Sequence, residues 1–180
     1  MNWMKKVAVA LVCLLPLGLQ AAKVDTLQVK SPSMNKSIEV VVVSPDMAAT
    51  EACPVIYLLH GYGGNARTWV GIKPDLPKIA DEKGIFFVCP DGKNTWYWDS
   101  PLNADVRYET FISDELVKYV DSHYKTVADR KGRAITGLSM GGHGAMWNGL
   151  RHSDVFSAAG STSGGVDIRP FPKNWEMSVQ

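Results

Sequence analysis

Residues 133–150 read Arg-Ala-Ile-Thr-Gly-Leu-Ser-Met-Gly-Gly-His-Gly-Ala-Met-Trp-Asn-Gly-Leu, and their pattern is the strongest indication of the fold class. The segment 133–136 is predicted to form a buried strand, and 143–150 a helix. Between them lies the spacing Gly-x-Ser-x-Gly, a sharp strand-to-helix turn with Ser139 at its tip. The flanking glycines leave room for a serine hydroxyl that projects clear of the sheet. The pattern predicts that Ser139 is a nucleophile; the alternative is a glycine-rich turn whose serine only caps the helix.

A second glycine-rich segment, His-Gly-Tyr-Gly-Gly at 60–64, directly follows the apolar run 54–59. A hydrolase that forms a tetrahedral oxyanion needs two backbone N–H groups aimed at one point. One comes from the residue after the nucleophile, here Met140, and the other from a loop after a neighbouring strand. We expect Tyr62 to supply the second N–H group; the alternative is an ordinary turn.

The remaining apolar patterns predict a doubly wound, mostly parallel sheet of the α/β class. Two alternating or β-branched segments near the start are expected to pair as antiparallel strands. The expected strands are 24–29, 37–43, 54–59, 85–89, 133–136 and 156–161, and the expected helices are 75–82, 109–123 and 143–150.

The first 22 residues are typical of a secretory signal peptide. Two lysines precede an apolar run at 7–19, which ends in small residues at Ala21 and Ala22. The run is short for a membrane span, although a membrane anchor is the alternative. We therefore expect cleavage after Ala21 or Ala22, a secreted or periplasmic protein, and no stable membrane insertion once the signal is removed.

Residues 23–180 are enough for one domain with a core. Two of the 19 basic residues lie in the predicted signal, which leaves 17 basic against 18 acidic residues. This balance does not favour nucleic-acid binding. No histidine pair has the spacing of metal ligands, so no metal and no cofactor is expected. Cys53 and Cys89 are expected at opposite ends of the parallel sheet, beyond the reach of a disulfide.

Three aromatic residues, Trp96 to Trp98, follow the predicted strand 85–89. Ligands of open α/β sheets bind beyond the carboxyl ends of the strands. Trp96 and Trp98 are therefore candidate walls of a substrate pocket, suited to stacking on a sugar or an aromatic ring. The alternative is that the loop packs its aromatic side chains onto the core.

The segments 57–64, 90–92, 108–109 and 137–142 together resemble the esterase D branch of the α/β-hydrolases. This branch includes feruloyl and acetyl-xylan esterase domains, S-formylglutathione hydrolases and the mycolyltransferase antigens. The resemblance implies an α/β-hydrolase fold, with Ser139 as nucleophile and with Met140 and Tyr62 as backbone oxyanion donors. It also implies carboxylester substrates, often acyl groups on plant polysaccharide or other sugars.

One departure concerns the base that must activate the serine, because in this fold the acid and the histidine follow the nucleophile along the chain. His143 lies on the helix that buries the turn, and His152 lies at the far end of that helix. His60 is expected to shape the oxyanion loop, and His123 to lie on the core face of its helix. No triad base is visible among the four histidines.

We therefore expect residues 23–180 to be the amino-terminal part of a longer esterase domain, without the last strands of its sheet. The expected function is that of a secreted serine carboxylester hydrolase, acting through an acyl-enzyme on Ser139. Its partners would be small-molecule or polysaccharide esters, of the feruloyl or acetyl type. The alternatives are an acyltransferase on the same scaffold, which excludes water, and a non-catalytic carbohydrate-binding remnant.

Overall fold

The computed structural model describes residues 22–167. The predicted signal peptide, apart from Ala22, lies outside these residues. Within them, no helix combines the length and the apolar character needed to cross a bilayer.

A six-stranded sheet organises the described chain, in the order β1-β2-β4-β3-β5-β6. Strands β1 and β2 form an antiparallel hairpin, β2 pairs antiparallel with β4, and the other neighbours pair in parallel. The predicted mostly parallel, doubly wound sheet with an antiparallel start is confirmed. The strands are β1 (Lys23–Ser31), β2 (Lys36–Ser44), β3 (Val55–Leu59), β4 (Phe86–Pro90), β5 (Arg133–Gly137) and β6 (Ala158–Ala159).

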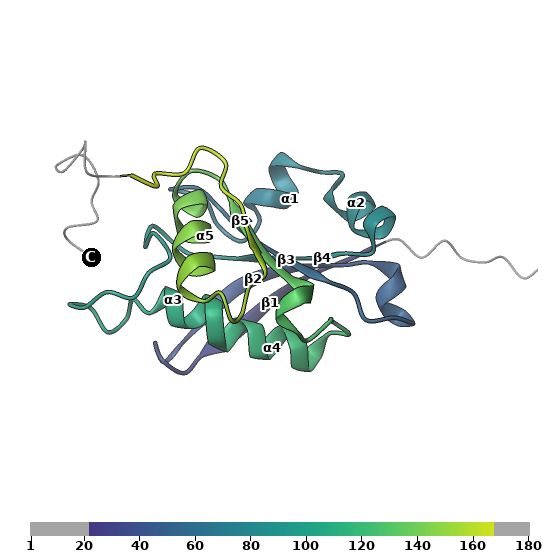
Figure 1. Ribbon diagram of the computed structural model, residues 1–180, viewed down its shortest axis with the longest axis horizontal. Helices are drawn as coiled ribbons and strands as arrows, with labels where there is room; N and C mark the ends of the chain where they lie inside the picture. The colour runs from purple at the N-terminus through teal and green to yellow at the C-terminus, as the bar shows by residue number, and fades with distance from the viewer. Residues whose placement is uncertain (1–21, 168–180) are drawn as a thin grey trace, which may run out of the picture.

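Helices cover both faces of this sheet (Figure 1). On one face lie α1 (Thr68–Ile72) and α2 (Leu76–Lys83). The other face is covered by α5 (Met140–Arg151) and by the helical run α3 (Tyr108–Thr110), a π-helical turn (Phe111–Glu115) and α4 (Leu116–His123). Single 3-10 turns occupy Asp46–Ala49 and Arg130–Gly132. Helix α1 was not expected from the sequence.

The alternation of side chains along β2 divides the core into two layers, because successive residues of a strand point to opposite faces. Val40 and Val42 join the larger cluster, which faces α4 and α5. Val41 and Val43 join the smaller cluster, with Leu76 of α2. The continuous apolar run of this strand therefore reflects burial on both faces.

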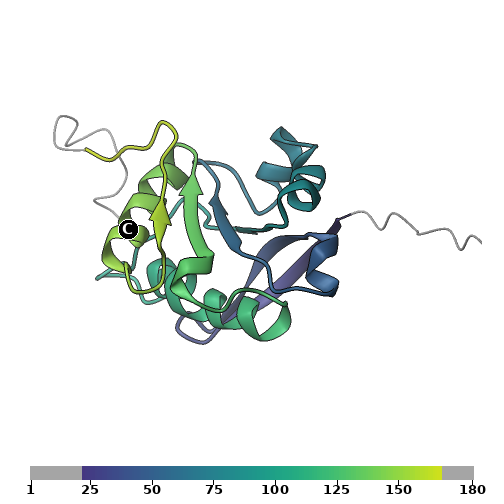
Figure 2. The same ribbon diagram turned by 45° about the vertical axis from the view of Figure 1, so that its right-hand side comes forward.

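Two details differ from the expectations. His123 is exposed rather than part of the core, because it ends α4, where its ring stacks on Tyr119 with centroids 4.0 Å apart. The expected strand at 156–161 contains only two strand residues, which are exposed beside β5 (Figure 2). Phe156, just before them, turns into the core and meets the ring of Tyr57 edge-on.

Candidate active site

Ser139 sits at the tip of the turn that joins β5 to α5, in a conformation that few residues with a side chain adopt. Its φ is 55° and its ψ is −116°. Such a strained backbone persists only where the surrounding chain holds it. Here the Ser139 N–H group donates to the carbonyl of Thr162 at 2.9 Å, and the Ser139 carbonyl accepts from His143 N at 3.0 Å. The residue is exposed, so its hydroxyl is available at the carboxyl edge of the sheet.

Both glycines of the motif are required by close contact. A Cβ atom on Gly137 would lie 2.3 Å from the carbonyl oxygen of Gly141, well inside the contact distance of real Cβ atoms. The turn can therefore close around Ser139 only when no side chain stands at Gly137.

Met140 is the first residue of α5. The first four N–H groups of a helix have no acceptor within the helix, and they lie at its positive end. The Met140 N–H group therefore has the position and polarity that an oxyanion donor needs. Its role as a donor stays a prediction.

The glycine-rich loop lies directly beside the serine turn. A Cβ atom on Gly61 would stand 3.5 Å from the Cβ of Ser139. The loop makes a tight turn, in which Gly64 N donates to the Gly61 carbonyl at 3.0 Å and Gly63 has a φ of 75°. Tyr62, at the tip of this turn, is 52% exposed. The structure thus brings the two glycine-rich motifs together, and the donor role of Tyr62 stays a prediction.

His60 ties this loop to the segment that follows β4. The ring is 1% exposed, and its Nε2 accepts the N–H group of Gly92 at 2.9 Å. The proton therefore sits on Nδ1, which donates to the Gly61 carbonyl at 2.7 Å. Both ring nitrogens are engaged in holding the loop, so His60 is not placed to act as a base for Ser139.

Asp91 supports the same corner, with Oδ1 3.5 Å from Nε2 of His60. Burial by itself raises the pKa of Asp91, but the hydrogen bonds and the charge of Lys93 outweigh burial and hold that pKa well below its usual range. Lys93 donates to Asp91 from its ammonium at 2.6 Å and from its backbone N–H at 2.9 Å. The carboxylate is therefore ionised and already paired.

The two tryptophans singled out in the sequence both pack toward α5. Trp96 is buried and meets the ring of His143 edge-on, with centroids 5.3 Å apart. Trp98 is half-buried and meets Trp147 edge-on at 6.2 Å. Their role as walls of a substrate pocket stays a prediction. Of the two side chains, that of Trp98 is the more accessible to a substrate.

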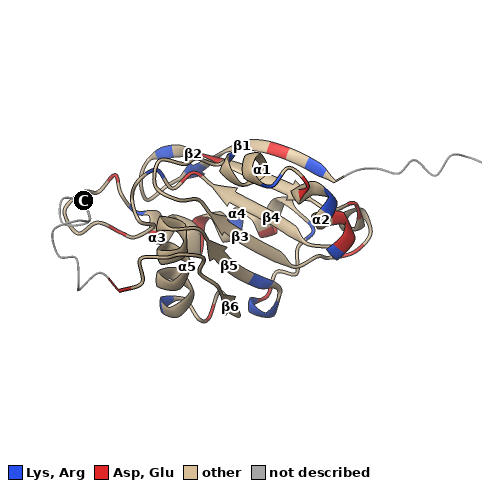
Figure 3. Ribbon diagram, turned by 90° about the horizontal axis from the view of Figure 1, so that it is seen from above, with Lys and Arg blue, Asp and Glu red and all other residues tan. Residues whose placement is uncertain are grey.

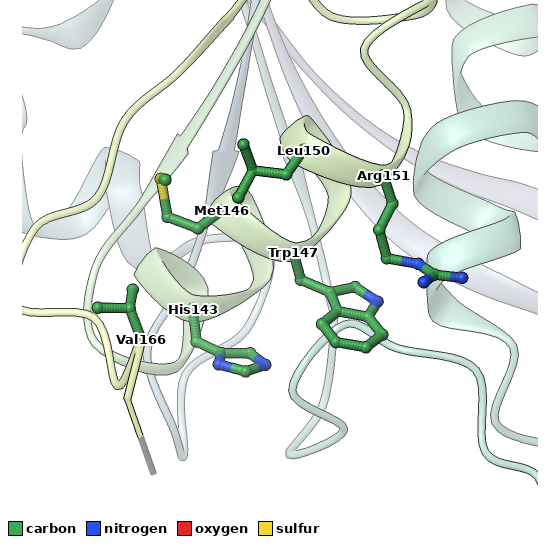
Figure 4. A pocket seen from close by; sticks show the side chains of 6 residues that line it. All are labelled: His143, Met146, Trp147, Leu150, Arg151 and Val166. Carbon is green, nitrogen blue, oxygen red and sulfur yellow. The ribbon is translucent and has the colours of Figure 1, made fainter. Parts of the chain in front are cut away.

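A hollow of about 340 Å³ runs along the outer side of α5 (Figure 4). Its lining comes from successive turns of that helix and from the segment after β6, and it does not include Ser139: His143, Met146, Trp147, Leu150, Arg151 and Val166. His143 and Trp147 lie nearly parallel, at an interplanar angle of 13°. The hollow therefore follows α5 away from Ser139.

The other histidines are also committed to contacts away from the serine. Nδ1 of His143 donates to the carbonyl of Gly165 at 2.9 Å, and burial lowers the pKa of this imidazole. Nε2 of His152 lies 2.9 Å from Glu109. All four histidines of the sequence fall within residues 22–167, and in that part of the chain none of their imidazole nitrogens is hydrogen-bonded to Ser139.

Glu109 is a residue whose importance the sequence did not reveal. Its carboxylate is buried under α5 and accepts hydrogen bonds from Trp147 Nε1 at 2.7 Å and from Arg151 Nε at 2.7 Å, besides the contact with His152. Burial raises the pKa of Glu109, but these partners outweigh it and leave the pKa below its ordinary value. The sequence feature that could have indicated this role is an acidic residue at a core-facing position of the helical run.

The profile of a family described as "Putative esterase" matches residues 31–178. This chain belongs to the esterase family. An esterase of Mycobacterium tuberculosis is 30% identical over 149 residues, which is 79% of this chain and 32% of the relative. The chain thus spans about a third of that relative's length.

Two solved structures extend the comparison. A ferulic acid esterase is 32% identical, with a TM-score of 0.66, and the match covers 77% of this chain and 61% of that one. A fluorophosphonate-binding serine hydrolase of Staphylococcus aureus is 19% identical, with a TM-score of 0.78, and the match covers 88% of this chain and 65% of that one. The second likeness concerns the fold alone, and the predicted α/β-hydrolase fold is confirmed.

Across residues 22–167, no three histidine, cysteine, aspartate or glutamate side chains converge as metal ligands would. Cys53 and Cys89 are separate, buried thiols. Basic and acidic residues lie interspersed along the described ribbon (Figure 3).

Proposed function

We propose that this esterase hydrolyses carboxylic esters through an acyl-enzyme on Ser139. The observation that carries the proposal is the left-handed backbone of Ser139, exposed at the start of α5 and flanked by the loop at 60–64. A strained serine at a strand-to-helix turn is the arrangement by which an α/β-hydrolase presents its nucleophile. Membership of the esterase family supports the same chemistry.

In this reaction the Ser139 hydroxyl attacks the ester carbonyl, and the negative charge that develops on oxygen is stabilised by the N–H groups of Met140 and Tyr62. Collapse of the tetrahedral intermediate expels the alcohol and leaves the acyl group on Ser139. Water then releases the acid and regenerates the serine. The contacts described above place no base beside Ser139, so a group outside these contacts must accept the serine proton.

The proposed substrates are feruloyl or acetyl esters of sugars or polysaccharides. Similarity to a ferulic acid esterase supports this class, and Trp98 is a candidate surface for an aromatic or sugar ring. The proposal also includes export to the periplasm or the medium, with a mature chain that begins at Ala22 or Lys23. Amino-terminal sequencing of the exported protein tests that part, and retention of Met1 would contradict it.

The central experiment uses the protein expressed from its complete gene, assayed with methyl ferulate and with a short-chain nitrophenyl ester. We expect turnover that Ser139→Ala abolishes and that Ser161→Ala, a control in the segment after β6, leaves largely intact. A fluorophosphonate probe should label Ser139 alone. An active Ser139→Ala variant, or labelling at another serine, would disprove the assignment. Transfer of the acyl group to an added alcohol in preference to water would instead favour an acyltransferase.

A further inference from the structure

Tyr97 lies between the two elements that carry the proposed oxyanion donors. Its side chain is fully buried, and its hydroxyl donates to the backbone carbonyl of His60 at 3.1 Å. The rings of Tyr97 and His60 also meet edge-on, with centroids 5.7 Å apart. Because His60 stands two residues before Tyr62, Tyr97 contacts the first residue of the loop at 60–64, which carries the proposed donor Tyr62.

The opposite side of Tyr97 is fastened to α5. Its carbonyl accepts a hydrogen bond from Nδ2 of Asn148 at 2.9 Å, and the Asn148 side chain is fully buried. The Tyr97 ring fills the space left by Gly144, where an added Cβ would lie 2.5 Å from Cδ2 of the ring. Tyr97 therefore touches the same helix that begins at Met140.

The backbone at this point is held in an uncommon conformation. Trp96 and Tyr97 have consecutive positive φ angles, 57° and 61°. Bulky residues rarely adopt left-handed conformations, and they keep them only where the surrounding structure imposes them. The carbonyl and the ring of Tyr97 can meet α5 while its hydroxyl meets His60 only because the chain turns in this way.

The hydroxyl acts as a donor over the whole working range of pH. Burial raises the pKa of Tyr97 well above its ordinary value. The phenol therefore stays protonated, and a carbonyl oxygen can only accept.

We propose that Tyr97 is a positioning residue that sets the separation between the N–H groups of Tyr62 and Met140. The catalytic part of this inference rests on the proposed function. Two donors that share one oxyanion must be held within about 0.5 Å of the productive geometry. Tyr97 reaches both supporting elements with one side chain and one carbonyl.

The test compares Tyr97→Phe with Tyr57→Phe in the full chain. Tyr57 is equally buried, and its hydroxyl has no hydrogen-bond partner among the described residues. The two variants thus make the same chemical change, but only one of them breaks a hydrogen bond. In hydrogen exchange followed by mass spectrometry, we expect the amides of 60–64 and 138–142 to exchange about fivefold faster in Tyr97→Phe. Tyr57→Phe should match the parent in both segments.

Kinetics of the complete protein give the second measurement. We expect Tyr97→Phe to lower kcat about fivefold with KM unchanged, because the oxyanion donors act in the transition state. Unchanged exchange in Tyr97→Phe, the same change in Tyr57→Phe, or global unfolding of Tyr97→Phe by circular dichroism would each overturn the proposal. A parent without Ser139-dependent turnover would contradict the proposed function, and the exchange data would still decide the role of Tyr97.

Discussion

Gly141 lies so close to the end of strand β3 that a Cβ atom on it would stand 2.2 Å from the carbonyl oxygen of Leu59. The same carbonyl accepts the N–H group of Leu138 at 3.2 Å. The first turn of α5 thus packs directly against the backbone of β3. This contact joins the serine turn to the strand that leads into the glycine-rich loop at 60–64.

Gly141→Ala is expected to lower the free energy of unfolding by about 3 kcal/mol or more, because the clash is with backbone that cannot move aside. Gly71→Ala is the matched control, since a Cβ there meets no atom within 4 Å. The control should be neutral or stabilise α1 by about 0.5 to 1 kcal/mol. Urea unfolding measures both, and equal stability of the two variants would contradict the close contact.

Glu109→Gln is expected to reduce stability in a pH-dependent way. The pKa of Glu109 in the folded chain lies below its ordinary value, since the hydrogen bonds from Arg151, Trp147 and His152 outweigh burial. Its stabilising effect is therefore complete above the unfolded pKa of about 4.3 and is lost as pH falls through the lower folded pKa. We expect a loss of about 2 kcal/mol at neutral pH, shrinking below about pH 4.

Urea unfolding at several pH values checks this prediction for Glu109. Glu82→Gln serves as the control, because Glu82 forms an exposed i,i+4 pair with Lys78 and such pairs contribute little. If the difference in free energy of unfolding between the parent and Glu109→Gln stayed constant down to acid pH, the charge of Glu109 would not be the source of the stabilisation.

Trp98→Ala is expected to raise KM for a feruloyl ester about tenfold and to leave KM for an acetyl ester nearly unchanged, since only the aromatic acyl group can stack on the indole. Trp96→Ala should instead destabilise the fold by about 3 to 5 kcal/mol, because this side chain is buried. Steady-state kinetics and thermal unfolding separate the two effects. Equal KM values of the parent and Trp98→Ala for the feruloyl ester would show that Trp98 does not line the substrate pocket.

Residues 23–180 expressed alone are expected to show only a residual rate of ester hydrolysis. A serine needs a base within about 2.6–3.2 Å, and the nitrogens of His60 are both engaged elsewhere. The oxyanion donors alone can leave a weak rate. Hydrolysis of nitrophenyl acetate, compared with Ser139→Ala, measures it. Robust Ser139-dependent turnover would mean that one of the four histidines rearranges to serve as the base.

Much of the fold could be predicted because its signals are local. The continuous apolar run of β2 and the Gly-x-Ser-x-Gly turn each specify a backbone conformation within a few residues. Their order along the chain then limits the topology to a doubly wound sheet. The exposed position of His123 was missed because it depends on where α4 ends, and the short α1 carries too few residues for a clear period.

The serine turn, the glycine-rich loop that accompanies it and the fold class can all be predicted from the amino-acid sequence, since they depend on backbone conformations that glycine and apolar spacing encode locally. Three features follow only from the folded arrangement: the tautomer of His60, the burial of Glu109 under α5 and the contacts of Tyr97 with both His60 and α5. Each of these depends on a partner at least 30 residues away along the chain, as with Gly92 for His60 and Asn148 for Tyr97. Local sequence patterns can indicate that a polar side chain will be buried or that the chain will turn. They do not identify the hydrogen-bond partner, because that depends on which elements the folded sheet brings side by side.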